Sequence, residues 1–388
     1  MKIAGVIAEY NPFHNGHAWH LRQTRALTGC DYIVVCMAGN FTQRGEAACA
    51  SKWARARAAL LCGADAVFEL PTLFAVRPAE AFAAGSVAIL GGLGADALCF
   101  GCETDDPALI RSLAMLKQNE PETFSRSVRR GLDMGMSHAR AWGEAAGAWL
   151  GLPAEAVKQP NLILAAEYLR AMARQGYDMQ PVPVKRRGEY HGGELGEYAS
   201  ASALRSAFER GQTEQALVCV PETARDCAMP DAMHPMDDLL LYRLREMSIE
   251  QLSALPDMGE GLEHRLYRLC RRKGARRELL EALKCKRYTY ARLSRVLTYA
   301  LLGMDAALIR ACPLPPYARL LGARRGTEAL LAELKRRTRI PIAPRAAALR
   351  GDTCFEAECR ATDIWALLHD APDQRLPGRE YRERFISV

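Results

Sequence analysis

No apolar run in this 388-residue sequence is long enough to cross a membrane. The longest apolar stretches, such as AFAAGSVAILGG, fall well short of the roughly 20 residues that a bilayer-spanning helix needs. The first residues also lack the long apolar segment and the small-residue cleavage site of a secretory signal. These absences argue against an integral membrane protein and a secreted one. We expect a cytoplasmic protein with no membrane partner.

The sequence offers little for a metal site or for disulfides. Its thirteen cysteines are odd in number and scattered, mostly among apolar residues, which is typical of buried free thiols in a large intracellular protein. Cys99 and Cys102 have C-x-x-C spacing, but no second pair of cysteines or histidines follows at the spacing of a zinc site. We therefore predict no metal site built by the protein.

Negative charge is scarce in one part of the chain. The net charge of the whole chain is +7, yet between residues 261 and 300 twelve basic residues face only three acidic ones. This stretch, which we call the basic helical region, has an excess of nine positive charges and exceeds the surplus of the whole protein. A field of this strength attracts a polyanion such as a nucleic acid.

The first hundred residues contain a regular alternation of strand-like and helix-like segments. Such an alternation predicts an α/β fold with a doubly wound parallel sheet, of the Rossmann-like kind. The segments expected as strands are Lys2–Glu9, Asp31–Ala38, Ala64–Leu70 and Ala95–Phe100. Those expected as helices are Gly16–Leu27, Ser51–Cys62, with Ser51 as N-cap, and Glu80–Leu93.

The fold class also predicts where a ligand binds, because ligands of open parallel sheets lie beyond the carboxyl ends of the strands. The segments at those ends are Glu9–His17, Gly39–Glu46, Leu70–Arg77 and Gly101–Glu103. Helical patterns dominate residues 107–175, Met179–Val184 reads as a further strand, and past residue 212 almost only helices are expected. We predict a nucleotide-binding catalytic domain at 1–211 and a mostly α-helical, basic domain at 212–388.

Three of the eight histidines, His14, His17 and His20, lie within seven residues directly after the first strand. A strand that runs through Asn-Pro-Phe-His-Asn-Gly-His into a helix places His17 at a helix N-terminus, which is an anion site. Gly16 lets a ligand approach the backbone closely. Both His14 and His17 can donate hydrogen bonds to phosphate oxygens. For His20 alone, a solvated helix face is the favoured interpretation.

These residues resemble those of the HIGH-type nucleotidyltransferase superfamily, here as His14-Asn15-Gly16-His17. The second hallmark of that superfamily is a late Ser/Thr-rich turn that ends in a basic residue, similar to I-S-S-T-x-I-R. This chain has ASASALR, which runs from Ala199 through Ser200 and Ser202 to Arg205, with alanine in place of the first Ile and the second Ser. The resemblance implies a doubly wound sheet and attack on the α-phosphate of ATP.

A closer resemblance, to the tRNA(Met) cytidine acetate ligase family, extends over nearly the whole chain. It is carried by VIAEYNPFHNGH, MAGNFTQRGE, SKWARARAALLCGADAVFELP, ALCFGCE, KRYTYARLSRVLTYALLG and PPYARLLGARRG. This resemblance implies that acetate attacks the α-phosphorus of ATP to give acetyl-adenylate and pyrophosphate. The wobble cytidine of elongator tRNA(Met) then takes the acetyl group and becomes N4-acetylcytidine.

The resemblance also implies which residues contact ATP. They are the segment Ile7, Ala8, Glu9, Tyr10, Asn11, Pro12, Phe13, His14, Asn15, Gly16 and His17, then His20, Gly101, Asn161, Ser202, Arg205, and one of Arg186 and Arg187. Mg²⁺ is expected to come with the triphosphate, since no dedicated carboxylate cluster stands out to hold it.

The chemistry itself requires positive groups, because acetate is a poor nucleophile that the triphosphate repels. The candidates for catalysis are His14, His17, Arg44 and Lys52, with Arg186 and Arg205 beside them. Arg44 lies in a loop after a strand, which favours a role in function. Lys52 could equally be a lysine on a helix surface. Glu46 could simply pair with Arg44, and Asp65 and Glu69 read as structural residues.

Contacts to tRNA need cationic side chains for phosphates and aromatic rings for splayed bases. The basic helical region supplies both in Lys284, Lys286, Arg287, Tyr288 and Arg292. The alternative for this run is an amphipathic helix with a solvated face. Two other functions stay open, namely a small-molecule adenylyltransferase of the same superfamily and a tRNA-binding module without catalysis. The sequence does not specify the oligomeric state.

Overall fold

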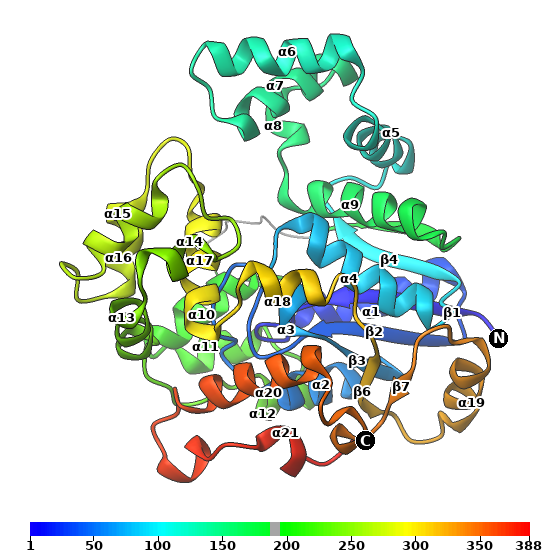
Figure 1. The fold of residues 1–388 in the computed structure, drawn as a ribbon. Helices are drawn as coiled ribbons and strands as arrows, with labels where there is room; N and C mark the ends of the chain where they lie inside the picture. The colour runs from blue at the N-terminus through cyan, green and yellow to red at the C-terminus, as the bar shows by residue number, and fades with distance from the viewer. Residues whose placement is uncertain (187–194) are drawn as a thin grey trace.

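The computed structural model describes residues 1–186 and 195–388, and its centre is one twisted sheet of eight strands (Figure 1). The strand order is β5-β4-β1-β2-β3-β6-β7, with β8 paired to β6. From β5 to β3 all neighbours are parallel, whereas β6 runs antiparallel to β3. The strands are β1 Ile3–Ala8, β2 Tyr32–Ala38, β3 Ala66–Leu70, β4 Ala97–Cys102, β5 Gln180–Lys185, β6 Ala318–Ala323, β7 Ile342–Ala343 and β8 Ile386–Ser387.

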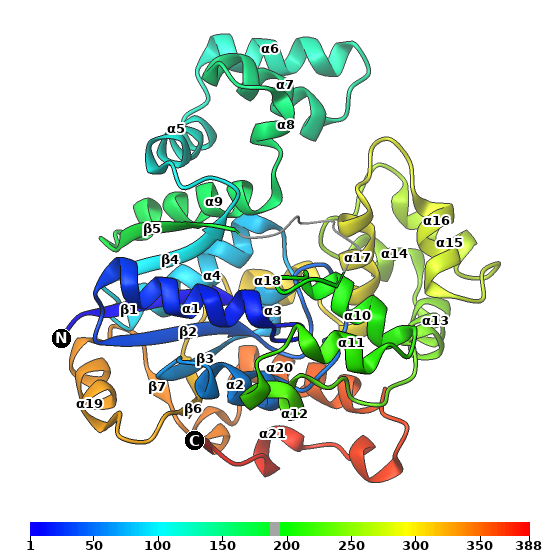
Figure 2. The same ribbon diagram turned by 180° about the vertical axis from the view of Figure 1, so that it is seen from behind.

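Helices cover both faces of this sheet, as a doubly wound fold requires (Figure 2). Successive strand residues point to opposite faces, so Val34 and Cys36 join the core under α4 and α9, while Ile33 and Val35 join the core under α1 and α2. The helices of the sheet region are α1 Asn15–Thr28, α2 Lys52–Leu61, α3 Thr72–Ala75, α4 Ala79–Gly92, α9 Pro160–Gln175, α10 Ala201–Glu209, α11 Thr213–Val218 and α12 Arg225–Ala228.

A small helical lobe stands out from the body beyond α9 (Figures 1 and 2). Its amphipathic helices pack on one another around Phe124 and Val128. The lobe consists of α5 Pro107–Gln118, α6 Glu122–Asp133, α7 His138–Leu150 and α8 Ala154–Val157. The helical prediction for residues 107–175 is therefore confirmed.

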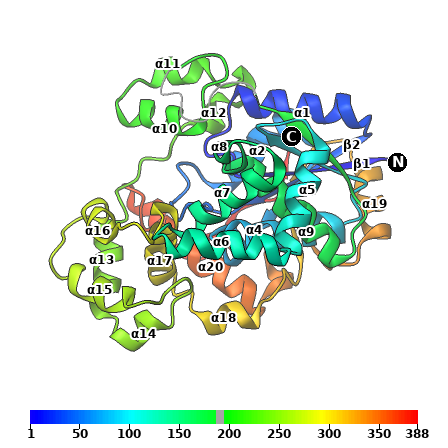
Figure 3. The ribbon, with the colours of Figure 1, turned by 90° about the horizontal axis from the view of Figure 1, so that it is seen from above.

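A second group of helices lies beside the body and contains the basic helical region (Figure 3). It comprises α13 Asp237–Glu246, α14 Ile249–Ser253, α15 Leu262–Leu269, α16 Arg276–Leu283, α17 Tyr290–Leu302 and α18 Ala306–Ala311. The chain then returns to the sheet through β6, α19 Glu328–Arg337, β7, α20 Thr353–Ala366, α21 Arg379–Arg382 and β8. Short 3-10 helices lie at Glu222–Ala224, Ala346–Leu349 and Pro372–Arg375.

The five parallel strands and their first three crossover helices match the predicted segments to within two residues at each end. Ser51 caps α2 as expected, because its hydroxyl accepts a hydrogen bond from the Ala54 N–H at 3.1 Å. The expectation of almost only helices past residue 212 is wrong. Residues 318–323 form β6 and extend the central sheet, so the helical part is confined to about residues 213–311 and the last seventy residues belong to the sheet body.

None of the helices among the described residues combines the length with the apolar character that a membrane crossing needs. All thirteen cysteines lie in the described part of the chain and are free thiols. Cys99 and Cys102 belong to the cores on opposite faces of the sheet. The two thiols therefore cannot bind the same metal ion, and their C-x-x-C spacing does not indicate a metal site.

Candidate active site

A cavity lies beyond the carboxyl ends of β1, β4 and β5, where the parallel sheet predicts a ligand site. Most of the residues predicted to contact ATP line it together. They are Ile7, Ala8, Glu9, Tyr10, Asn11, His14, Gly16, His17, His20, Gly101, Asn161, Arg186, Ser202 and Arg205, and Arg44 joins them. Arg187 lies outside the described residues.

His14 and His17 form the N-terminal cap of α1, and each ring uses its Nδ1 to do so. The Nδ1 of His14 accepts a hydrogen bond from the Gly16 N–H at 3.1 Å, and the Nδ1 of His17 accepts one from the His14 N–H at 3.2 Å. An imidazole whose Nδ1 accepts carries its proton on Nε2 when neutral. The rings lie 3.7 Å apart between centroids. Both can therefore offer an Nε2–H donor at the helix end.

Burial keeps these histidines neutral. It lowers the pKa of His14 to about 3, with the Arg186 guanidinium adding to the effect. Burial also lowers the pKa of His17 far below its usual value, and the pKa of His20 to about 4. His20 is not on a solvated face, since it lines the cavity and its Nε2 lies 3.9 Å from the Sγ of Cys99. Neutral donors fit a phosphate chain, which needs hydrogen bonds but already brings its own charge.

A second helix N-terminus faces the same cavity. Ser200 caps α10 by accepting a hydrogen bond from the Ala203 N–H at 3.2 Å, and its hydroxyl lies 3.0 Å from that of Ser202. Arg205 donates from Nη1 to the backbone oxygen of Asn11 at 2.6 Å, which ties α10 to the turn after β1. Two helix dipoles and two arginines, Arg186 and Arg205, thus give the cavity an anion-binding end.

Gly101 and Asn161 form the wall at the end of β4. A Cβ placed on Gly101 would meet only the Arg186 side chain, at 3.5 Å, so the bare backbone here faces the cavity. Glu103 holds Asn161 at the start of α9, because its carboxylate accepts from the Asn161 Nδ2 at 2.7 Å and from the Leu162 N–H at 2.8 Å. This wall suits a planar base or a ribose better than a phosphate.

Three residues of the predicted segment shape the site without lining it. The Phe13 ring is fully buried and packs against the rings of Tyr10 and His17. Pro12 follows a cis peptide bond. The Asn15 N–H donates to the Cys219 oxygen at 2.8 Å, outside the cavity. Tyr10 itself has φ +51°, a left-handed conformation that a non-glycine residue rarely adopts and that often marks a functional turn.

Arg44 reaches the cavity from a tight turn that we call the Arg44 loop (residues 42–46). The turn closes with a hydrogen bond from the Gly45 N–H to the Thr42 oxygen at 2.9 Å. The Gln43 N–H donates to the Glu9 carboxylate at 2.7 Å. The Glu46 carboxylate at the end of the turn lies 3.8 Å from the Arg205 guanidinium, so it faces α10 as well as its own loop.

Lys52 is not brought to the cavity. Its side chain is fully buried, and its Nζ donates to Glu69, to Glu380 at 2.5 Å and to Glu358 at 2.9 Å. Together with Arg319, which bonds Glu69 at 2.9 Å and also Glu380, these residues form the buried ion cluster. An ammonium that three carboxylates surround has no route to a nucleotide, so the structure gives Lys52 a structural place instead of a catalytic one.

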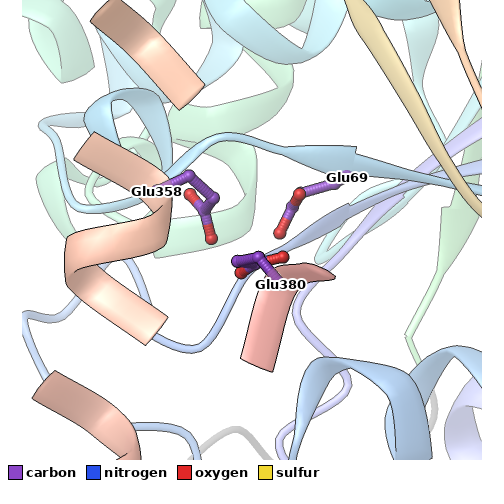
Figure 4. Close-up of side chains that lie close together, drawn as sticks. All are labelled: Glu69, Glu358 and Glu380. Atoms are coloured by element: carbon purple, nitrogen blue, oxygen red, sulfur yellow. The ribbon is translucent and has the colours of Figure 1, made fainter. Parts of the chain in front are cut away.

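The three glutamates of the buried ion cluster point toward one another (Figure 4), and their oxygens lie within 4.8 Å, close enough to ligate a metal ion. Lys52 already supplies the cation at that point. Burial raises the pKa of Glu69, and the neighbouring carboxylates add to the rise. Burial opposes ionisation of Glu358 as well, but the Lys52 ammonium outweighs it and lowers that pKa. The two cations Lys52 and Arg319 thus face three carboxylates in the interior of the protein.

Sequence reasoning missed several residues that line the cavity, notably Trp19, Phe82, Leu164, Tyr168 and Tyr198. On α9 a signal was available. Asn161, Leu164 and Tyr168 are spaced by three and four residues, which places them on one face of a helix. Asn161 was expected to contact the nucleotide. Leu164 and Tyr168 share its helix face, so the spacing predicts that they line the same cavity.

The residues predicted to bind tRNA divide into exposed and buried ones. Lys284, Lys286 and Arg287 are exposed. Tyr288 is only 5% exposed, and its hydroxyl donates to the Gly259 oxygen at 3.3 Å, so the expectation that this ring stacks on a base is wrong. The Arg292 guanidinium lies over the Tyr288 ring and donates to the Asp257 oxygen at 2.7 Å. Tyr290, 45% exposed at the start of α17, presents a ring to solvent instead.

Comparisons with known proteins agree with this geometry. The HIGH Nucleotidyl Transferase family matches residues 1–379. A tRNA(Met) cytidine acetate ligase from Fervidobacterium nodosum is 32% identical, with all of both chains covered, and one from Latilactobacillus sakei is 38% identical over 90% of each chain.

Solved structures of Thermotoga maritima TmcAL are similar over the full length of both chains at 28% identity. The TM-score is 0.90 for the form bound with alpha-thio ATP and 0.92 for an apo form. The fold, the paired histidine cap of the cavity and the full-length likeness lead to one conclusion. This chain belongs to the HIGH nucleotidyl transferases and, among them, to the tRNA(Met) cytidine acetate ligase family.

Proposed function

We propose that this protein is an ATP-dependent ligase that activates acetate as acetyl-adenylate and transfers the acetyl group to the wobble cytidine of elongator tRNA(Met). The observation that carries the proposal is the anion-binding end of the cavity, where neutral His14 and His17 cap α1 opposite Arg186 and Arg205. The relatives that carry this activity in their names span the whole chain, and a similar structure binds an ATP analogue.

In the first step, a carboxylate oxygen of acetate attacks the α-phosphorus of ATP and pyrophosphate leaves. Negative charge grows on the phosphate oxygens as this happens, so fixed donors aimed at them lower the barrier. The Nε2–H groups of His14 and His17, the N-terminus of α10 and the Arg205 guanidinium are such donors. The arginines also offset the repulsion between acetate and the triphosphate.

Mg²⁺ accompanies the triphosphate in this proposal and shields its charge. Among residues 1–186 and 195–388, the carboxylates that line the cavity belong to Glu9 and Glu46. Glu9 is bonded to the Arg44 loop and Glu46 faces Arg205, so neither is arranged as part of a ready ligand set. The phosphate oxygens and water would therefore supply most of the ligands of the ion.

In the second step, the RNA delivers its base to the same cavity. Lys284, Lys286 and Arg287 are exposed on the basic helical region, which supports phosphate contacts there. ATP and tRNA are both present in the cytoplasm, and we infer that the protein acts there.

The test is mass spectrometry of nucleosides from tRNA incubated with the protein, ATP and isotope-labelled acetate. We expect labelled N4-acetylcytidine in elongator tRNA(Met) and in no other tRNA. Transfer of AMP to a small phosphate-bearing molecule, with no labelled nucleoside, would instead indicate an adenylyltransferase and would contradict the proposal.

A further inference from the structure

Glu9 places a negatively charged side chain in a cavity whose arginines suit an anion. It follows β1 directly and lines the cavity beside Arg44 and Arg205. Its Oε1 accepts the Gln43 N–H at 2.7 Å, and its backbone oxygen accepts a hydrogen bond from Arg55 at 2.5 Å. A carboxylate held this firmly next to a triphosphate costs binding energy through repulsion. A role in the chemistry would explain why it is there.

We propose that Glu9 is the general base of the acyl-transfer step. The inference rests on the proposed function above. The exocyclic amine of the cytosine attacks the acetyl carbonyl carbon of acetyl-adenylate and forms the new C–N bond. The bond from the acetyl carbon to the phosphate oxygen breaks, and AMP leaves with that electron pair. The proton of the amine passes to the Glu9 carboxylate, which later releases it to water.

The position of Glu9 fits the side from which RNA would enter. The Arg44 loop that binds its carboxylate is itself held by α17 of the basic helical region, through Ser294 and Thr298. The loop beside Glu9 is therefore held by the helix that directly follows the exposed basic residues proposed to contact tRNA. The histidine cap belongs to the other side of the turn, on α1. Glu9 thus lies between the histidine cap on α1 and the Arg44 loop, beside Arg205, where an activated acyl phosphate would meet the incoming base.

The protonation of Glu9 fits a base. Burial raises its pKa above the usual value, while the Gln43 N–H and the guanidinium groups of Arg205, Arg44 and Arg55 oppose the rise. Tyr168 on α9 lines the same cavity, and the Glu9 charge adds to the burial that raises the pKa of its phenol. A carboxylate with a raised pKa takes a proton more readily than an exposed one. Glu46, the other carboxylate that lines the cavity in the described part of the chain, lies 3.8 Å from the Arg205 guanidinium.

The test compares two reactions of the full-length protein. Acetate-dependent exchange of pyrophosphate into ATP reports the first step, and single-turnover transfer from synthetic acetyl-adenylate to tRNA reports the second. In Glu9→Gln the amide oxygen can still accept the Gln43 N–H, so the loop stays in place. We expect this variant to lose about 100-fold or more in transfer, at least thirtyfold more than it loses in exchange. Glu9→Asp should recover part of the transfer rate.

The pH profile gives a second readout. Wild-type transfer should rise with pH as Glu9 deprotonates, and the rise should vanish in Glu9→Gln. Equal losses of exchange and transfer in Glu9→Gln would assign the carboxylate to nucleotide or metal binding and overturn the proposal. A selective loss of transfer in Glu46→Gln, with Glu9→Gln active, would overturn it as well. Absence of exchange in the wild-type protein would instead refute the proposed function itself.

Discussion

Each ring of the histidine pair has two tasks, and its two nitrogens divide them. The Nδ1 atoms of His14 and His17 accept backbone N–H groups that would otherwise be unpaired at the start of α1, which fixes both ring planes. The Nε2 atoms then remain as donors. Because burial holds both pKa values far below neutral, these donors do not change protonation state over the physiological range.

Replacing His17 with alanine should therefore impair the first chemical step. Loss of one preorganised donor to a developing oxyanion typically costs about 10²–10³-fold in rate. We expect acetate-dependent pyrophosphate exchange to fall by about that factor in His17→Ala, while tRNA affinity stays within twofold. His138→Ala on α7, outside the cavity, is the control. Normal exchange in His17→Ala would exclude a role for this ring at the phosphates.

At the scale of elements, the Arg44 loop is the joint between the catalytic sheet and the helical part. The Ser294 hydroxyl donates to the Arg44 oxygen at 2.5 Å. The Thr298 hydroxyl donates to the Gly45 oxygen at 2.7 Å, and Arg276 donates to the same oxygen at 2.9 Å. Gly45 has φ +71°, and a Cβ there would come within 2.7 Å of the Arg295 backbone. The loop conformation is thus fixed by α17 and by the glycine.

Changes at this joint should disturb catalysis more than they disturb the fold. Gly45→Ala should destabilise the protein by more than about 1 kcal/mol through its φ angle alone and should displace Arg44. Ser294→Ala removes one hydroxyl and should lower transfer to tRNA severalfold with a small change in melting temperature. Ser253→Ala, on α14 and bonded only within its own helix, is the matched control. Equal kinetics of Ser294→Ala and Ser253→Ala would show that the joint does not position Arg44.

The elements that the sequence predicted best are the buried parallel strands. The run in β2, YIVVCMA, is apolar at nearly every position because both faces are covered, and it ends before the glycine and polar residues of a loop. The segment of β6, ARLLGA, is also mostly apolar, but it is short and lies between helices. In so short a segment, the spacing of apolar residues does not distinguish a strand from a helix. Residues 318–323 form a strand because they pair with β3, which lies some 250 residues earlier in the sequence.

The site was predictable where its residues are local in sequence and unpredictable where distant partners decide. His14, His17 and Arg205 lie in contiguous motifs at helix starts, so their place could be read from neighbours. Lys52 also follows a helix N-cap, but its partners Glu358 and Glu380 lie about three hundred residues further on. Nothing near Lys52 indicates that it is buried. Tyr288 likewise turns inward because Gly259 and Glu260 accept its hydroxyl.

At the scale of the whole molecule, the buried ion cluster connects both ends of the chain. It joins α2 and β3 from the first seventy residues to β6, α20 and α21 from the last seventy. Removal of one partner from a buried network leaves uncompensated charge, which costs about 3–5 kcal/mol. The cluster therefore holds the C-terminal segment on the sheet.

Lys52→Met should lower the free energy of unfolding by about 3–5 kcal/mol, measured by urea denaturation. The folded fraction should keep its affinity for an ATP analogue, since Lys52 lies away from the cavity. Lys335→Met, on the exposed face of α19, should change neither quantity. If the Lys52→Met protein has normal stability but fails to bind the analogue, Lys52 contributes to nucleotide binding and the structural role is wrong.

Variants that remove positive charge test whether the cavity activates acetate while the basic helical region binds tRNA. Lys286→Ala together with Arg287→Ala should weaken tRNA binding and reduce the salt dependence of log Kd by about two phosphate contacts, while pyrophosphate exchange continues. Lys335→Ala with Arg336→Ala removes the same charge from α19, which lies at the opposite side of the sheet body (Figure 1). Equal effects of the two double variants would show that the basic helical region attracts tRNA only through the overall positive charge of the protein and makes no specific phosphate contacts.

The central claim is that the paired imidazoles at the start of α1 hold the phosphate chain of ATP. The most direct measurement is a crystal structure of this protein with a non-hydrolysable ATP analogue. We predict phosphate oxygens within hydrogen-bonding distance of the Nε2 atoms of His14 and His17, with the base against Gly101 and Asn161. A triphosphate bound elsewhere, with both rings facing away from it, would contradict the account.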